Sequence, residues 1–271
     1  MSLYVVEMRR ALHRRVVWVL IAIALVGCTA AGLIAFFDSA GRTVAELHVN
    51  GQTHPAVMRD WWVSGSGEGA LTIASLFLLF GGLLGGASVA GAEWRAGTVT
   101  TLLTWEPRRV RVQFARCGAC ATLAALIALA LQTLFLAALL PAVLAHGSTA
   151  GLDGAWWAAL AAAMARTAIM TAVAATLGCA LSTLGRNTAF ALLTVFAWVA
   201  VVEGLIRGLR PATARMLWGE NIATVVQWAP LQDVEFHRGP VTALLTVVAY
   251  LGVIVAVSTW SFVRRDVAAV S

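Results

Sequence analysis

The sequence predicts an all-α membrane protein with six transmembrane helices. The 271-residue chain is 60% hydrophobic and only 12% charged, about half the charged fraction of a soluble domain. A helix needs about 20 apolar residues to cross a bilayer. In lipid every backbone N–H and C=O must be hydrogen-bonded within its own segment, so apolar runs of this length are expected to be helices. The six expected spans are residues 16–37, 71–92, 117–145, 167–184, 189–209 and 241–263.

The first apolar run follows a basic flank, which is also a feature of secretory signal peptides. Its 22 residues are too many for the apolar core of a signal peptide, and no small-residue cleavage motif followed by a soluble domain is present. We therefore expect residues 16–37 to be a retained first span. The whole chain, 1–271, is then expected to be a single transmembrane domain.

The distribution of arginines predicts the orientation of the spans. The side that holds residues 1–15, 93–116, 185–188 and 264–271 carries 12 arginines against four acids, and the other side carries seven against nine. Basic residues are enriched on the cytoplasmic side of membrane proteins, so both termini are predicted to be cytoplasmic. No nucleic-acid partner is expected, because such binding requires a basic face on a folded domain outside the membrane.

Two segments on the predicted outer side are longer than simple turns. Residues 48–69 are polar and glycine-rich, and residues 210–240 mix tryptophan and valine with charged side chains. We expect the exterior segment 210–240 to be re-entrant, with short helices that dip back towards the membrane. Residues 154–166 are expected to form a helix along the outer surface before the fourth span.

The chain contains no lysine, so the 19 side chains counted as Lys or Arg are all arginines. A phosphate-binding P-loop places a lysine on the β- and γ-phosphates of ATP. Schiff-base and Ser-x-x-Lys catalysis also require lysine. The chain is therefore not expected to be an enzyme of these classes or to bind a cofactor itself. Any ATP and Mg²⁺ used in its function are expected on a separate ATPase.

Other catalytic and metal-binding signals in the sequence are weak. Cys117 and Cys120 have C-x-x-C spacing, but no second Cys or His pair completes a zinc site. Small residues at a helix contact are the favoured interpretation of this pair. Residues 64–67, Ser-Gly-Ser-Gly, superficially resemble the serine motif of rhomboid proteases, but no histidine lies in a later span to act as its base. No catalytic or metal-ligating residue is predicted.

Three polar residues within the spans are candidates for a transport pathway and gate. Glu203 and Arg207 lie four residues apart near the outer end of the fifth span, so they share a helix face and can pair. Such residues indicate a bundle interior or wet cavity, or else an interfacial pair that extends outward; both interpretations stay open. Gln132, in the third span, either bonds across helices or faces a cavity.

Glycines in the second span form two overlapping small-xxx-small pairs, which allow two helix backbones to approach closely. The close contact is either within the chain or between two subunits, and the sequence leaves this open. These glycines, together with the fifth span, are the candidate subunit interface; they are Gly81, Gly82, Gly85 and Gly86.

Residues 93–116, EWRAGTVTTLLTWEPRRVRVQFAR, form a charged insert between the second and third spans and hold five of the arginines. The segment resembles the loop between spans two and three of ABC-2-type transporter permeases. In that family an acid closes span two, Gly-Thr follows, and a leucine-rich helix leads to a Pro-Arg-Arg-like stretch. The matching residues here are Glu93, Gly97-Thr98, Leu102-Leu103 and Pro107-Arg108-Arg109.

Three further features belong to this resemblance. Residues 7–18, EMRRALHRRVVW, are similar to the amphipathic helix that precedes span one in the family. Arg116 stands where relatives often have lysine, a departure that keeps the charge. The arginine-only composition resembles that of proteins from high-GC actinobacteria.

The resemblance implies an ABC-2-type exporter fold and a role as the permease subunit of an ABC transporter in a bacterial cell membrane. Two such subunits are expected to pair as a homodimer in membrane lipid, each docked on a cytoplasmic ABC ATPase. An apolar side that includes Val99 and Trp105 would sit in a groove of the ATPase, and its movement would alternate access to a shared cavity. The expected ATPase-coupling residues are Glu93, Trp94, Arg95, Gly97, Thr98, Leu102, Leu103, Pro107, Arg108 and Arg109.

Two alternatives to an exporter stay open. In the first, the ATPase drives these helices to act on an extracytoplasmic partner, with no transported substrate. In the second, the chain is a non-ABC intramembrane enzyme or scaffold, which would leave segment 93–116 unexplained. For an exporter, apolar cavity walls favour a hydrophobic drug, peptide or lipid as the substrate.

Overall fold

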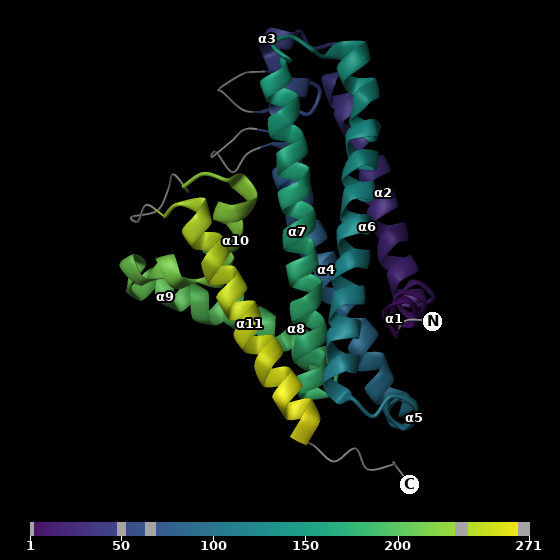
Figure 1. Cartoon of the computed structure of the whole chain (residues 1–271). Coiled ribbons are helices and arrows are strands. Elements are labelled where there is room, and N and C mark those ends of the chain that lie inside the picture. Colours follow the sequence, from purple (N-terminus) through teal and green to yellow (C-terminus); the bar gives the residue numbers. More distant parts are fainter. Residues whose placement is uncertain (1–2, 48–52, 63–68, 231–237, 265–271) are drawn as a thin grey trace.

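The computed structural model describes residues 3–47, 53–62, 69–230 and 238–264, and their regular secondary structure is helical apart from one isolated bridge between Val57 and Ser148 (Figure 1). Within these residues, six helical segments are long and apolar enough to cross a membrane. The expectation of a multi-pass, all-α membrane protein is therefore confirmed. The six segments are α2 (Arg15–Ser39), α4 (Ala70–Arg95), α6 (Arg109–His146), α7 (Gly154–Gly185), the fifth span (Thr188–Leu209) and α11 (Pro240–Arg264).

The fifth span has three parts, and shorter helices connect the spans. Its parts are α8 (Thr188–Phe196), the π-helix η3 (Ala197–Glu203) and α9 (Gly204–Leu209). The remaining short helices are α1 (Leu3–Leu12), α3 (Val44–Leu47), η2 (Met58–Trp61), α5 (Thr98–Trp105), η4 (Pro211–Met216) and α10 (Trp218–Gln227).

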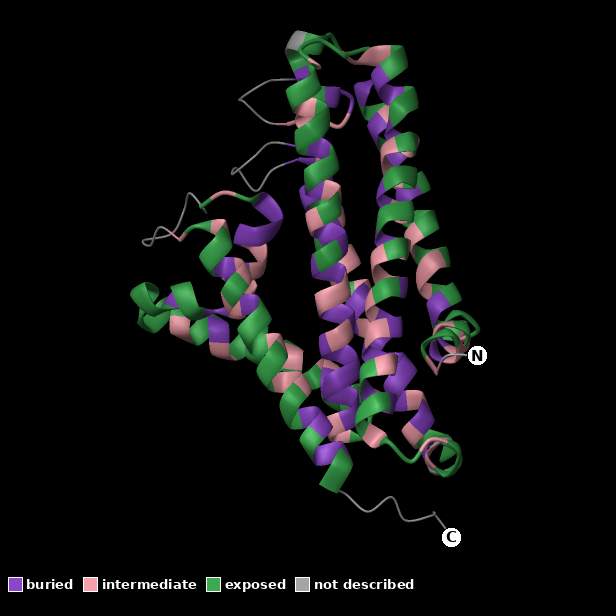
Figure 2. Cartoon of the chain, viewed as in Figure 1, coloured by how far each residue is buried: buried purple, intermediate pink, exposed green. Residues whose placement is uncertain are grey.

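The bundle is built around α7, which packs against α4, α6 and α11. In α7, 72% of the most apolar window is buried inside the chain, against 11% in both α2 and the fifth span. Figure 2 accordingly shows buried residues concentrated where α4, α6 and α7 meet, and exposed residues along α9 and α11. The outer helices therefore present most of their apolar surface to lipid or to another protein.

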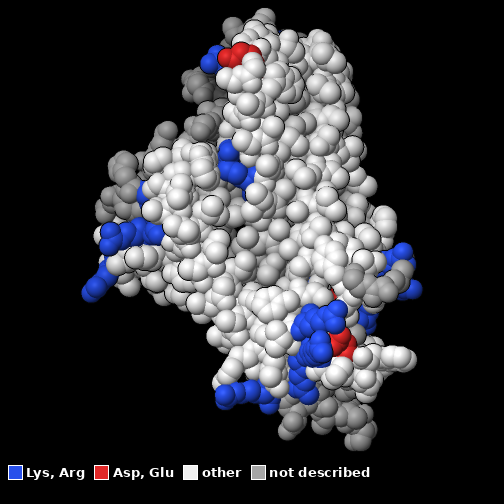
Figure 3. All heavy atoms as spheres, in the orientation of Figure 1, with Lys and Arg blue, Asp and Glu red and all other residues white. Residues whose placement is uncertain are grey.

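One end of the bundle gathers α1, α5, the start of α6 and the last turn of α11 (Figure 1). Arginine side chains collect there, as Figure 3 shows below the mostly uncharged middle of the molecule. We call this region the arginine-rich end. It brings together the segments that the sequence analysis placed on one side of the membrane.

Two helices extend further than expected from the apolar runs. The helix α6 begins at Arg109 rather than at residue 117, and its 38 residues correspond to about 57 Å, well beyond a hydrocarbon core of about 30 Å. Residues 154–166 do not form a separate surface helix, because α7 runs unbroken from Gly154 to Gly185. Asp153 caps its start by accepting a hydrogen bond from the Trp156 backbone N–H at 2.7 Å.

Segment 210–240 contains the short helices η4 and α10. Its helix α10 packs against α11 and α7 rather than standing alone. Residues 231–237 of this segment, and the Ser-Gly-Ser-Gly stretch at 64–67, lie outside the described residues.

The small-residue face of α4 is divided between two neighbours. A Cβ built at Gly82 would lie 2.7 Å from the Thr171 carbonyl oxygen, and one built at Gly86 would overlap the Ala175 carbonyl. Both glycines therefore serve close packing of α4 against α7, which is the contact within the chain that the sequence left open beside a subunit interface. A Cβ at Gly85 would meet only Leu20 of α2, at 4.0 Å. The fourth glycine, Gly81, has open space around it.

Candidate functional site

A buried group of charges holds three helices together at the arginine-rich end. Arg116 of α6 is 0% exposed, and its guanidinium donates a hydrogen bond to the Glu93 carboxylate at the end of α4. Its Nε lies 3.9 Å from Oε2 of Glu7, which is a buried residue of α1. Burying a charge is costly unless a partner compensates it, so each of these side chains requires the others.

Two partly exposed arginines complete this group from the N-terminal side. Nη1 of Arg10 lies 3.1 Å from Oε1 of Glu7 and 3.5 Å from Oε1 of Glu93. Nη2 of Arg14, in the turn between α1 and α2, lies 3.5 Å from the same Glu93 oxygen. The two carboxylates and three guanidiniums (Glu7, Glu93, Arg10, Arg14 and Arg116) are called the charge cluster below. It fixes α1 to the ends of α4 and α6.

Burial has a further effect on Glu7. Loss of hydration raises the pKa of the Glu7 carboxyl above its ordinary value, although the nearby Arg116 charge acts in the opposite direction. The neighbouring Glu93 charge adds to the increase. Because the folded state raises this pKa, it binds the Glu7 proton more tightly than the unfolded chain does. Rising pH therefore weakens this contribution to the attachment of α1.

Much of the apolar side of segment 93–105, which the sequence analysis expected to dock on an ATPase, packs against its own chain. The Trp94 ring meets the Phe262 ring edge-on at 6.1 Å between centroids, and the Arg186 guanidinium lies over Trp94 at 5.0 Å. Val99 is buried in a cluster with Phe262 of α11 and Val112 of α6, against which Leu103 also packs. An amphipathic helix buries its apolar side on whichever surface is available, and α6 and α11 supply one here.

A different part of the segment is exposed. The Trp105 side chain is 84% exposed at the end of α5. Arg95, Thr98, Pro107 and Arg108 are exposed as well. Gly97 joins α4 to α5 with a φ of +67°, a conformation that favours glycine. Among the predicted coupling residues, only the side chain of Leu102 lies outside what the structure describes.

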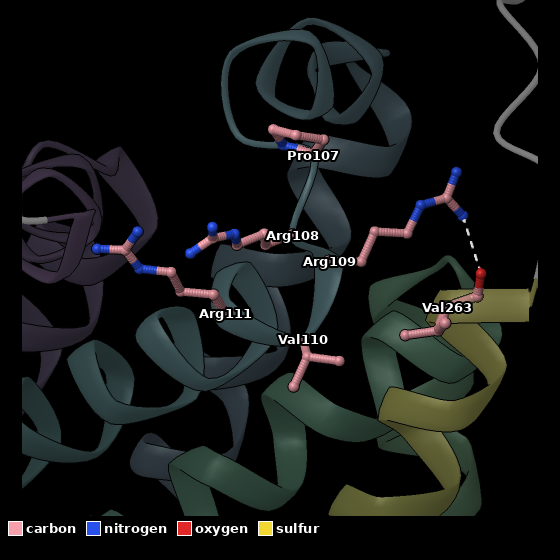
Figure 4. A pocket seen from close by; sticks show the side chains of 6 residues that line it. All are labelled: Pro107, Arg108, Arg109, Val110, Arg111 and Val263. Atoms are coloured by element: carbon pink, nitrogen blue, oxygen red, sulfur yellow. Dashed lines mark hydrogen bonds between the residues drawn. The ribbon is translucent and has the colours of Figure 1, made fainter.

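The stretch after α5 forms the wall of a shallow groove beside α11. Figure 4 shows Arg108 and Arg111 extending on the side away from α11, while Arg109 extends towards it. Nη1 of Arg109 donates to the backbone carbonyls of Phe262 at 3.1 Å and Val263 at 3.4 Å. Arg109 is thus a link between α6 and α11, whereas Arg108 and Arg111 are exposed. The groove is lined by Pro107, Arg108, Arg109, Val110, Arg111 and Val263.

Gln132 is buried between α6 and α7. Its Nε2 donates to the carbonyl of Ala128 in its own helix at 3.1 Å and to that of Met164 in α7 at 3.2 Å. Of the two interpretations that the sequence left open, the structure confirms the bond across helices. This contact gives Gln132 a structural role in joining two spans.

The predicted pair of Glu203 and Arg207 is not formed. Glu203 is 0% exposed and accepts hydrogen bonds from the backbone N–H groups of Trp218 at 2.8 Å and Gly219 at 3.1 Å. It also accepts one from Nε1 of Trp198, at 3.1 Å, across the π-helix. The N-terminal N–H groups of α10 lack partners within their helix and carry partial positive charge, so they compete effectively for the carboxylate. Arg207 pairs instead with Glu220, at 2.6 Å.

The cysteines of the C-x-x-C motif lie in a helix contact, as the sequence favoured. Cys117 and Cys120 are buried against α7, where Sγ of Cys117 is 3.7 Å from Sγ of Cys179. Across the described residues, no group of three or more His, Cys, Asp or Glu side chains could hold a metal ion.

Sequence reasoning missed the roles of Glu7 and Arg116. Glu7 was noted only as the first residue of the segment that is similar to the family's amphipathic helix, and Arg116 only as an arginine where relatives often have lysine. The two residues are far apart in sequence, so no local pattern indicates that they meet. The one available signal was that an acid and an arginine both lie near the membrane ends of their helices. Comparison of the chain with models of protein families and with curated proteins found no match.

Proposed function

We propose that the chain is the permease subunit of an ABC-2-type exporter in a bacterial cell membrane, with its arginine-rich end in the cytoplasm and a separate ATPase docked there. The observation that carries this proposal is the combination of an exposed surface at α5 with a buried ion pair between the two helices that α5 connects. Trp105 and Arg108 stand out from the fold, whereas Glu93 and Arg116 are buried on the two helices that α5 connects.

The docking surface consists of the exposed residues Trp105, Pro107, Arg108 and Arg111. Tryptophan and arginine are the side chains that most often dominate binding energy at protein interfaces. Trp105 would insert into an apolar pocket of the ATPase, and the arginines would face acidic side chains at its rim. This surface differs from the one expected from sequence, because Trp94, Val99 and Leu103 are used inside the chain.

The charge cluster gives the coupling mechanism. The helix α5 continues into α4 on one side and α6 on the other, and the ion pairs of Arg116 with Glu93 and Glu7 tie those helices to α1. A displacement of α5 by the ATPase would then move α1, α4 and α6 as one unit. Without the cluster, the connecting turns at Gly97 and Pro107 would absorb the motion.

A second copy of the chain completes the proposed transporter. The fifth span exposes large apolar side chains on α8, η3 and α9, including Leu193, Phe196, Val201 and Leu205. We place the subunit contact on this face, since Gly82 and Gly86 of α4 are already engaged with α7. The transport pathway would run between the two copies and carry a hydrophobic substrate.

Co-purification with the ATPase tests this function. The chain should be co-expressed with the proteins encoded next to it, and complexes should be isolated through a tag on the chain. Trp105→Ala combined with Arg108→Gln should reduce recovery of the ATPase about 30-fold or more, because a truncated anchor commonly costs about 2 kcal/mol or more. Trp157→Ala, at an exposed tryptophan at the other end of the bundle, is the matched control. Recovery of no ATPase by the unmodified chain, or equal recovery by both variants, would contradict the proposal.

A further inference from the structure

A basic groove lies between the turn joining α1 to α2 and the last turns of α4. It has a volume of about 350 Å³ and is lined by His13, Arg14, Arg15, Ser88 and Arg95, together with Val16 and Ala92. None of the described residues that line it is acidic. The groove thus offers several positive or hydrogen-bonding side chains to one ligand.

Two of these arginines are not neutralised by the fold. Glu93 contacts Arg14 of the groove at 3.5 Å, and it is already engaged by Arg116. Across the described residues, no acid pairs with Arg15 or Arg95. A phosphate oxygen would accept charge-assisted hydrogen bonds from such guanidiniums.

The groove lies where the chain passes into the membrane. Arg15 is the first residue of the first span, and Arg95 is the last residue of the second. The Trp18 ring is exposed one turn further along α2, and its Nε1 donates to the Leu12 carbonyl at 2.9 Å. An indole that keeps its N–H bonded and its ring towards lipid is typical of the headgroup level of a bilayer. A lipid phosphate therefore reaches this groove without leaving its leaflet.

Beyond the groove, the side of α4 that carries Gly81 and Gly85 has open space beside it, which we call the furrow. A Cβ at Gly85 would meet only Leu20, at 4.0 Å, and a Cβ at Gly81 would meet nothing within 4 Å. Ser88, one turn nearer the groove, already lines it. On the opposite face of the same helix, a Cβ at Gly86 would overlap α7. The α2 side of α4 therefore has space for an acyl chain that the α7 side lacks.

We propose that this groove binds an anionic phospholipid, with its phosphate between Arg15 and Arg95 and one acyl chain beside Gly81 and Gly85. The groove recognises net negative charge. It therefore fits phosphatidylglycerol, which is anionic, and not phosphatidylcholine, which has no net charge. The Arg14 guanidinium, whose Nη2 lies 3.5 Å from Oε1 of Glu93, would be shared between Glu93 and the lipid phosphate. The bound lipid thereby braces the α1–α2 turn against α4. This proposal does not depend on the transport function.

Native mass spectrometry of the intact chain, released from detergent with defined lipids, tests the proposal. The unmodified chain should retain one phosphatidylglycerol in preference to phosphatidylcholine. Arg15→Gln combined with Arg95→Gln should weaken phosphatidylglycerol binding about 30-fold, since each arginine near an anionic headgroup contributes about 1 kcal/mol. Gly85→Leu, which fills the furrow, should also weaken lipid binding.

The matched control replaces two exposed arginines of the same end that do not line the groove, Arg9→Gln with Arg264→Gln. It should retain the lipid. Equal losses of phosphatidylglycerol binding in the two double variants would overturn the proposal in favour of diffuse surface charge. Equal retention of phosphatidylglycerol and phosphatidylcholine by the unmodified chain would also overturn it. Competition by inorganic phosphate at millimolar concentration, or by glycerol phosphate without acyl chains, would also overturn it, because the site would then bind a free anion.

Discussion

Replacing Arg116 with methionine should destabilise the protein by about 3 kcal/mol. Removing one partner of a buried ion pair typically costs about 3–5 kcal/mol, because the remaining charge is left without compensation. Arg116 is 0% exposed and is the cation closest to the Glu93 carboxylate. Arg10 and Arg14 lie 3.5 Å from the same carboxylate and are partly exposed, so they can relieve part of the loss. We therefore expect the lower part of the range.

Unfolding in mixed micelles, followed by the fluorescence of the 11 tryptophans, measures this cost. Arg111→Met is the matched control, because Arg111 is 56% exposed and, within the described part of the chain, its acidic partner is Glu106, at 3.1 Å. An exposed pair contributes about 0–1 kcal/mol. Adding Glu93→Gln to Arg116→Met should recover part of the stability, since the second change removes the charge that the first left uncompensated.

Equal stabilities of the Arg116→Met and Arg111→Met variants would refute the charge cluster as the attachment of α1. A double variant less stable than Arg116→Met alone would assign the main stabilising role of Glu93 to its contacts with Arg10 and Arg14.

Three further outcomes are expected. Gly86→Ala should destabilise the protein by about 1–3 kcal/mol in the same assay, because its Cβ overlaps the Ala175 carbonyl, whereas Gly81→Ala should not. Glu203→Ala should cost about 2 kcal/mol and make α10 more sensitive to limited proteolysis, since buried N–H groups lose their acceptor. The melting temperature should fall as the pH rises through the raised pKa of Glu7. The stability that the Glu7 proton contributes is fully present below the pKa of Glu7 in the unfolded chain. Glu7→Gln should therefore make the melting temperature less dependent on pH.

The six spans could be predicted from sequence because the bilayer leaves few alternatives to a helix. An apolar run indicates which part of a helix lies in lipid, however, and not where the helix begins and ends. It therefore placed the start of the third span at residue 117, although α6 begins at Arg109. For the same reason it separated residues 154–166 from α7, where no residue interrupts the helix.

The candidate site was less predictable, because its contacts are tertiary. Helical spacing places Glu203 and Arg207 on one face, but it says nothing of the α10 N-terminus that binds Glu203 instead. The amphipathic pattern of segment 93–105 was read correctly, yet the surface that covers Val99 belongs to α6 and α11 of the same chain. Arg116 meets Glu7 across more than 100 residues of sequence, and no local pattern reports such a contact.

We propose that the exposed surface around Trp105 contacts a separate ATPase. A photo-reactive amino acid placed at position 105 in living cells tests this most directly, with position 157 at the opposite end as the control. Position 105 should crosslink to a soluble protein with a nucleotide-binding P-loop, and position 157 should not. Crosslinks from position 105 only to lipid or to another copy of the chain, or the same adduct from both positions, would contradict it.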